Sequence, residues 1–153
     1  METANASPRT LYNGVYRHGV DDKRRVQVPA RWRPSEPGCE LTVILWPSPQ
    51  GPCLRVLLPS KLDDLMRDLN NLPGEEQKKG TLKRYIGSKS AQVTLDKVGR
   101  ICLPDEMSKA AGITDEAVLV GVLDKYEIWS PERHDQVQVS DEVLAQEAMK
   151  LLE

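Results

Sequence analysis

Two short polar loops have the residue types and spacing of a turn that could bind an anion. One contains Asp21 and Arg25, the other contains Asp96 and Arg100, and three residues separate the acid from the base in each. An Asp that opens a turn can accept hydrogen bonds from the backbone two residues on, which fixes the loop. A guanidinium held at the loop edge presents a planar fork that suits a phosphate or a guanine edge. The same pair could instead brace the turn, and the residues alone leave bracing and binding open.

Further cations lie inside these loops. Lys23 and Arg24 precede Arg25 in the first loop, whereas the second loop has one extra cation, Lys97. Gly99 in the second loop would supply a positive φ if the turn demands one. The predicted binding residues are Lys23, Arg24, Arg25, Lys97 and Arg100.

This difference in local charge predicts different roles for the two arginines. Arg25 ends a run of three cations, so we expect it mainly to contact a partner. Arg100 has only Lys97 as a cationic neighbour in its loop, so we expect it mainly to brace Asp96. Replacing Arg25 should then affect binding more, and replacing Arg100 should affect stability more.

Both loops belong to a repeat with an offset of 75 residues. Residues 20–29 and 95–104 each read apolar, Asp, three residues, Arg, apolar, any residue, apolar, Pro. Further along, residues 41–45 match the apolar run 117–120, and residues 54–57 match 126–129. Each copy therefore predicts one supersecondary unit: a strand, the Asp–Arg loop, a second strand, a short helix opened by proline, and a hairpin.

Helices are predicted within, between and after the two units. Their expected positions are residues 105–111 with a stop at Gly112, a helix capped by Ser60, a linking helix over residues 75–85, a start at Ser130-Pro131, and a C-terminal helix capped by Ser140. The whole pattern predicts an α+β fold, mainly β, with two tandem β units and short flanking helices.

Charge is segregated along the chain, although the net charge is only −2. Residues 9–33 hold seven Lys/Arg against two Asp/Glu, and residues 78–100 hold seven against one, whereas 34–77 and 101–153 are acidic. If the fold gathers the basic stretches, the protein has an anion-binding surface despite an acidic pI of about 5.8. On charge alone, a solvated face without a partner is equally open.

The sequence carries no motif typical of an enzyme, so we predict no catalytic residue, metal site or cofactor. His18 and His134 are the only histidines, neither lies in a nucleophile, metal or phosphate-loop motif, and His18 is expected to be structural in the first strand. The three cysteines are widely spaced ordinary thiols, and we expect Cys102 in the core. No apolar run reaches bilayer length and no signal-peptide pattern precedes the first unit, so we expect a cytoplasmic protein without a membrane partner.

The combination of motifs resembles the MraZ family over about residues 12–134. The matching pieces are Gly14-Val15-Tyr16, residues 20–25 with 28–33, residues 95–100 with Leu103-Pro104, and Gly121 with Glu127-Ile128-Trp129. The resemblance implies that the two units are AbrB-like swapped hairpins. It also implies a bacterial transcriptional regulator of a cell-division and cell-wall gene cluster, whose relatives form closed rings and bind short direct repeats in promoter DNA. The family's basic loop residues fall on Lys23, Arg25 and Arg100, while Arg24 replaces the usual loop glycine of the first copy.

The expected organisation is a flexible N-terminus over residues 1–10, a first AbrB-like repeat over 11–72, a linking helix over 73–88, a second repeat over 89–135 and an acidic C-terminal helix over 136–153. The expected partners are double-stranded DNA and further copies of the chain in a ring-like homo-oligomer, associated with the nucleoid. An antitoxin-like module that binds DNA and a protein is the alternative, and the acidic tail keeps it open. The duplication argues against it, because such an antitoxin would normally carry one unit per chain.

Overall fold

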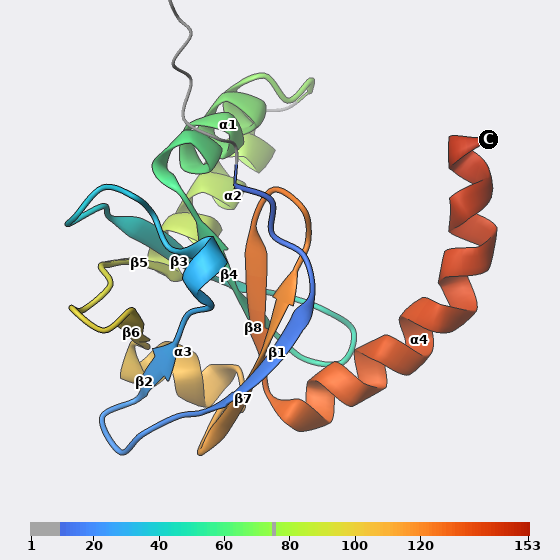
Figure 1. Cartoon of the computed structure of the whole chain (residues 1–153). Coiled ribbons are helices and arrows are strands. Elements are labelled where there is room, and N and C mark those ends of the chain that lie inside the picture. Colours follow the sequence, from blue (N-terminus) through green and yellow to red (C-terminus); the bar gives the residue numbers. More distant parts are fainter. Residues whose placement is uncertain (1–9, 75) are drawn as a thin grey trace, which may run out of the picture.

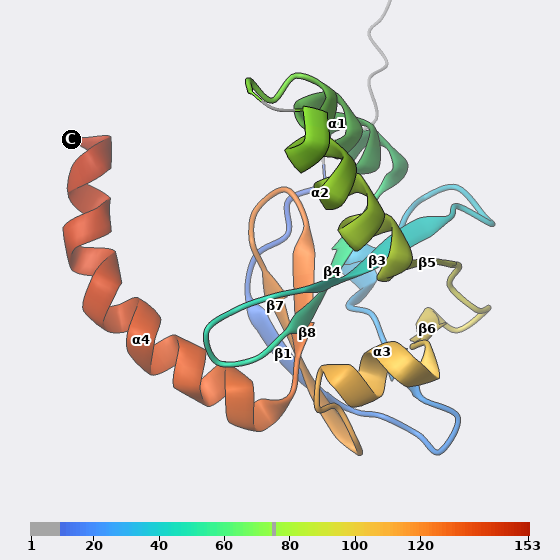
Figure 2. The same cartoon turned by 180° about the vertical axis from the view of Figure 1, so that it is seen from behind.

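Strands and short helices alternate along the chain in two similar series, which Figures 1 and 2 show from opposite sides. The computed structural model describes residues 10–74 and 76–153. The first series is β1 (Val15–Gly19), β2 (Arg25–Gln27), the 3-10 helix η2 (Ala30–Trp32), β3 (Leu41–Trp46) and β4 (Cys53–Leu57), followed by α1 (Pro59–Asn70) and α2 (Glu76–Ser88). The second series is β5 (Ser90–Val93), β6 (Arg100–Cys102), α3 (Asp105–Ala110), β7 (Glu116–Gly121) and β8 (Tyr126–Trp129), followed by α4 (Pro131–Met149) and η3 (Lys150–Leu152).

The two series exchange strands with each other. One six-stranded sheet has the order β1-β7-β8-β4-β3-β5, and a separate two-stranded sheet pairs β2 with β6. The first strand of each copy thus pairs with the hairpin of the other copy: Val15 lies opposite Val120, and Val93 lies opposite Leu41. All of these pairs are antiparallel. The predicted α+β fold with two tandem swapped-hairpin units is confirmed.

The core forms where the two copies meet, because the strands that follow the two loops alternate between an inward and an outward face. Val26, Val28, Ile101 and Leu103 are fully buried. Burying an aliphatic side chain of this size stabilises the fold by about 1.5–3 kcal/mol. Cys102 points outward between Ile101 and Leu103 and is exposed, so its predicted place in the core is wrong.

An aromatic cluster continues this core. The Trp32 ring stacks on Tyr126 at 5.0 Å between centroids and meets Tyr12 edge-on at 5.9 Å. Burial raises the pKa of Tyr12 to about 12 and raises that of Tyr126 as well. The Tyr126 hydroxyl is buried and has no hydrogen-bond partner among the described residues.

The proline after each second strand starts a helical turn, as predicted. Pro29 and Pro104 both have extended ψ angles, near 139° and 137°, and precede η2 and α3. α3 ends at Ala110, close to the predicted stop at Gly112. η2 is shorter because Arg33, which precedes Pro34, is already extended.

Two of the predicted helix caps are wrong. α1 begins at Pro59 with Leu58 in the cap position, because the residue before a proline favours an extended backbone and Pro suits the first helical position. Ser60 therefore lies inside the helix. Ser130 caps α4, its Oγ accepting a hydrogen bond from the Arg133 amide at 3.2 Å. α4 then continues through Ser140 without interruption.

The linking helix is present as α2, from Glu76 to Ser88. Its predicted first residue, Glu75, and the flexible N-terminus predicted over 1–10, apart from Thr10, lie outside the described residues. Within the described ranges, the chain contains no helix with both the length and the hydropathy required to span a bilayer.

Candidate nucleic-acid interface

The first loop is organised around the Asp21 carboxylate. Its Oδ1 accepts hydrogen bonds from the backbone amides of Lys23 at 3.0 Å and Arg25 at 2.8 Å, and its Oδ2 accepts one from Arg25 Nε at 2.7 Å. The Asp21 carbonyl also accepts the Arg24 amide at 2.9 Å. One side chain therefore holds the turn and fixes the guanidinium that closes it.

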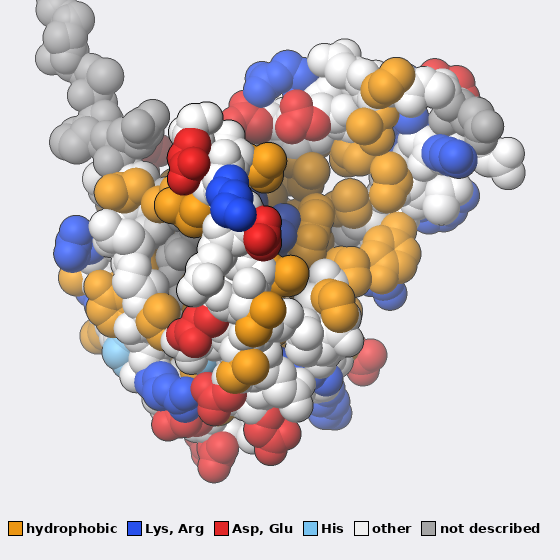
Figure 3. Space-filling view, turned by 90° about the vertical axis from the view of Figure 1, so that its right-hand side faces the viewer, with side chains coloured by type: hydrophobic (Ala, Val, Ile, Leu, Met, Phe, Trp, Pro, Cys, Tyr) orange, Lys and Arg blue, Asp and Glu red, His pale blue; other side chains and the backbone are white. Residues whose placement is uncertain are grey.

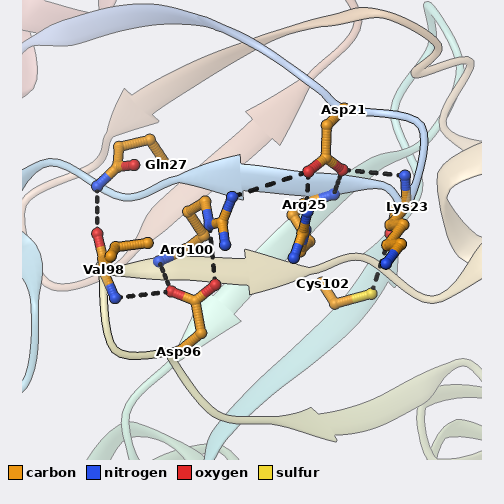
Figure 4. A network of polar contacts seen from close by, with 8 residues as sticks. All are labelled: Asp21, Lys23, Arg25, Gln27, Asp96, Val98, Arg100 and Cys102. Carbon is orange, nitrogen blue, oxygen red and sulfur yellow. Dashed lines mark hydrogen bonds and ion pairs between the residues drawn. The ribbon is translucent and has the colours of Figure 1, made fainter.

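The second loop repeats this geometry around Asp96. Asp96 Oδ1 accepts the amides of Val98 at 3.0 Å and Arg100 at 2.9 Å, and Oδ2 accepts Arg100 Nε at 2.8 Å. Figure 4 shows the two networks facing each other across the β2–β6 pair. The side chains of Arg25 and Arg100 are 33% and 31% exposed. The predicted difference between a binding Arg25 and a bracing Arg100 is therefore absent from the geometry: both arginines brace their loops in the same way.

Both carboxylates are electrostatically suited to stay ionised. The Arg25 amide, assisted by its guanidinium, lowers the pKa of Asp21 from its ordinary value of 3.8. The Arg100 amide and guanidinium lower that of Asp96 in the same way. The hydrogen bonds to the charged form are the largest cause in each case.

Contacts across the copies hold the two loops side by side. The Leu103 amide donates to the Arg24 carbonyl at 2.8 Å, and the Val28 amide donates to the Gly99 carbonyl at 3.0 Å. Gln27 on β2 and Cys102 on β6 occupy equivalent outward-facing positions, and each contacts the loop of the other repeat. Gln27 Nε2 donates to the Val98 carbonyl at 2.8 Å. The Cys102 thiol lies 3.3 Å from the Lys23 carbonyl (Figure 4). Neither loop can move far without disturbing the other.

Arg24 and Gly99 occupy equivalent positions, and both have the positive φ that this turn demands, +60° and +85°. Gly99 adopts it at little cost, whereas the Cβ of Arg24 makes it unfavourable. The Arg24 side chain lies against the second repeat of the same chain. Its Nε donates to the Leu103 carbonyl at 3.4 Å, and a guanidinium nitrogen lies 3.5 Å from Asp105 Oδ1. These contacts help to offset the backbone strain.

The five predicted site residues all lie on the two loops, which the fold brings together at one end of the molecule. Lys23 and Lys97 are exposed at the tips. The Nη groups of Arg25 have no acceptor among the described residues, and one of Arg100 lies 3.9 Å from Asp21 Oδ2. The basic residues of α2 are not part of this surface, because α2 lies with α1 over another part of the sheet (Figures 1 and 2).

Three residues that sequence reasoning missed also shape this surface. Arg33 Nε donates to the Val28 carbonyl at 2.9 Å, and its guanidinium covers Gly99, where a Cβ would overlap it. Gln27 and Asp105 make the contacts described above. Gln27 and Asp105 contact residues 71 and 81 positions away, and Arg33 covers a glycine 66 positions away, so the local sequence carries no signal for these contacts.

Comparisons with known proteins identify relatives of this chain. A family model described as "MraZ protein, putative antitoxin-like" matches residues 88–151. A "Transcriptional regulator MraZ" from Lachnoclostridium phytofermentans is 36% identical over 123 residues, covering 80% of this chain and 84% of the relative. Proteins of the same name from Roseiflexus sp. (strain RS-1) and Rickettsia felis are 32% and 33% identical over 130 and 139 residues. They cover 83% and 90% of this chain, and 86% and 93% of the relatives.

Proposed function

The chain belongs to the MraZ family, and from that premise we propose that it regulates transcription by binding double-stranded DNA through its two paired loops. The observation that carries the proposal is the arrangement of the loops at residues 20–25 and 95–100. They lie side by side, each is held rigid by an Asp–Arg pair, and each presents cations outward. A preorganised cationic edge binds with a smaller loss of conformational entropy than a flexible one.

The loop residues divide into two roles in this proposal. Lys23 and Lys97 are exposed and contact phosphates, which supply affinity without sequence information. Arg25 and Arg100 use Nε to hold the carboxylates and direct their Nη groups toward the DNA, where the guanidinium fork can reach a phosphate or a guanine edge. Arg24 adds a third cation to the first loop, so the two halves of the surface are unequal in charge.

The resemblance to the family supplies the finer expectations. The DNA target is a set of short direct repeats in the promoter of a cell-division and cell-wall gene cluster, and the chain acts on the nucleoid as a ring-like homo-oligomer. Self-association would multiply a modest cationic edge, because loops on linked copies bind at high effective concentration. The largely exposed helices α2 and α4 support self-association.

Fluorescence anisotropy with DNA from upstream of the gene tests DNA binding, using a titration at several salt concentrations. Each phosphate contact contributes about 0.9 to the slope of log affinity against log salt. K23A and K97A should each make that slope shallower and weaken binding, whereas K61A removes the same charge from α1 and should change neither. Affinity that does not change with salt, or equal slopes for all three variants, would refute the cationic edge as the DNA site.

An antitoxin-like module is the second candidate, favoured by the exposed acidic helix α4. It predicts that the product of a neighbouring gene arrests growth and that this chain relieves the arrest. A gene next door with no effect on growth, together with a cell-wall and division cluster downstream, would favour the regulator.

A further inference from the structure

Two helices pack only lightly against the rest of the described chain: α2 contacts α1, and α4 contacts the sheet near its start, where Val137 is half-buried. α2 has 13 residues and α4 has 19, and neither contains a buried residue. By contrast, α1 buries Leu69 and α3 buries Met107. Helices in proteins owe most of their stability to tertiary packing, and an isolated helix as short as α2 is marginal in water. A contact outside the single chain is therefore the natural source of their stability.

Both helices expose apolar side chains that such a contact would bury. On α4, Val143 is 72% exposed and Val139 is 66% exposed, and one helical turn separates them on the same face. On α2, Leu82 and Tyr85 are exposed three residues apart. Figure 3 views the molecule from the side of α4 and shows hydrophobic side chains on this helix and across the hollow beside it.

The charges beside these apolar groups are opposite on the two helices. α2 holds four basic residues and one acid, Glu76, whereas α4 holds five acids and one arginine, Arg133. Glu142 lies between Val139 and Val143 on the exposed face of α4. On α2, Lys78 lies one turn before Leu82 on the same face, whereas Lys83 and Arg84 lie about 100° and 200° around the helix from Leu82. Each helix therefore combines an apolar stripe with charges that attract the other.

The two helices of one chain lie apart. In Figures 1 and 2, α4 extends away to one side of the body, whereas α2 lies with α1 over the sheet. A contact between α2 and α4 therefore joins two protein molecules. Since the surfaces on α2 and α4 differ, the contact is heterologous, and each molecule offers a free surface to a further molecule.

We propose that α4 of one protein molecule packs its acidic, valine-bearing face against the basic face of α2 of the next molecule. This inference rests on the self-association in the proposed function and goes beyond it by naming the two surfaces. Because charge complementarity selects the contact, salt should weaken assembly as well as DNA binding. A different protein bound at α4 is the competing occupant, and the experiment below separates the two.

The test uses charge-reversed variants of the full chain. One carries K78E on α2, and the other carries E142K on α4, because these two charged residues lie next to the apolar side chains of their helices. Alone, each variant places like charges in the contact, and we expect the concentration for half-assembly to rise by about tenfold or more. Light scattering and sedimentation should then give masses closer to the 17.2 kDa chain than the native protein gives at the same concentration.

Mixing the two variants in equal amounts supplies the decisive result. The unchanged α4 of the first variant then meets the unchanged α2 of the second. The reversed position on α4 of the second variant faces the reversed position on α2 of the first, so opposite charges meet at both contacts. We expect the mixture to recover the native mass. R31E and E106K are matched charge reversals outside both helices and should assemble like the native chain. Circular dichroism and melting curves confirm that each variant is folded.

Two outcomes would overturn the proposal. One is a native chain that stays at 17.2 kDa at micromolar concentration, which leaves α4 to another protein. The other is native assembly that both variants retain, or that their mixture fails to restore. DNA binding by the same samples is measured separately by anisotropy, so failure of the α2–α4 contact is distinguishable from failure of the loops to bind DNA.

Discussion

Replacing Gly99 with alanine tests the construction of the second loop most directly. Gly99 has φ +85°, and an added Cβ would overlap the guanidinium of Arg33. The left-handed conformation costs a residue with a Cβ about 1–2 kcal/mol. Moving Arg33 aside breaks its hydrogen bond to the Val28 carbonyl, and hydrogen bonds of charged groups are worth about 1.5–3 kcal/mol. Alanine also restricts the unfolded chain, which returns about 0.4–1 kcal/mol.

The expected net loss for G99A is about 1.5–4.5 kcal/mol of unfolding free energy. For a chain of this length, a loss of 1 kcal/mol lowers Tm by about 3–4 °C, so Tm should fall by about 5–18 °C. Urea titration followed by circular dichroism gives the free energy, and differential scanning calorimetry gives Tm. All proteins are compared at one concentration, because self-association would shift both values.

The Gly38→Ala variant separates the two causes. Gly38 has φ +74°, and no atom lies within 4 Å of its would-be Cβ. It should therefore show only the backbone cost, about 1 kcal/mol. If G99A and G38A lose equal stability, the Arg33 contact contributes nothing. A G99A protein as stable as the native chain would refute the conformation assigned to the loop.

Other features of the fold lead to three further expectations. R25A and R100A should lower Tm by similar amounts because the two braces are equivalent, and a clear difference in their melting curves would show that one loop depends less on its arginine. The pKa values of Asp21 and Asp96 are lower in the folded state, so these groups contribute stability that is complete above their ordinary pKa of 3.8 and is lost as pH falls through the lower folded values. A D21N/D96N double variant should lose less stability than the native chain between about pH 5 and pH 2 in urea titrations, and parallel losses would contradict the assignment. Tyr126→Phe should keep or raise the unfolding free energy by about 1 kcal/mol, because the buried hydroxyl lacks a partner; a large loss would reveal a hydrogen bond to that oxygen.

Features with a local signal could be predicted from the sequence. The Asp-x-x-x-Arg spacing indicated both turns because the carboxylate bonds amides only two and four residues away. The prolines at 29 and 104 marked the starts of η2 and α3, and apolar alternation marked the strands. The swapped arrangement followed from resemblance to a family, since no local rule says that β1 pairs with β7 and not with its own hairpin.

What could not be predicted depends on distant partners or on competition between signals. Ser60 looked like a helix cap, but Pro59 beside it fixes the helix start two residues earlier, with Leu58 as the cap. Ser140 looked like another cap, but Ser130 with Pro131 starts the helix and nothing after it breaks the hydrogen-bond ladder. Arg25 and Arg100 make the same hydrogen bond to the carboxylate of their loop. The sequence did not predict this equality, because the two loops differ in charge and charge says nothing about hydrogen-bond geometry.

The exchange of strands also determines the order in which this protein can be made. β1 leaves the ribosome early, but its partner β7 begins at Glu116, about a hundred residues later. At about 5–20 residues per second, that delay is roughly 5–20 s. During this time β3 and β4 can form their hairpin, while the edge that β5 later occupies stays open. The nascent chain therefore exposes an unfinished sheet until late in translation, and a chaperone that covers strand edges would find its target on the ribosome.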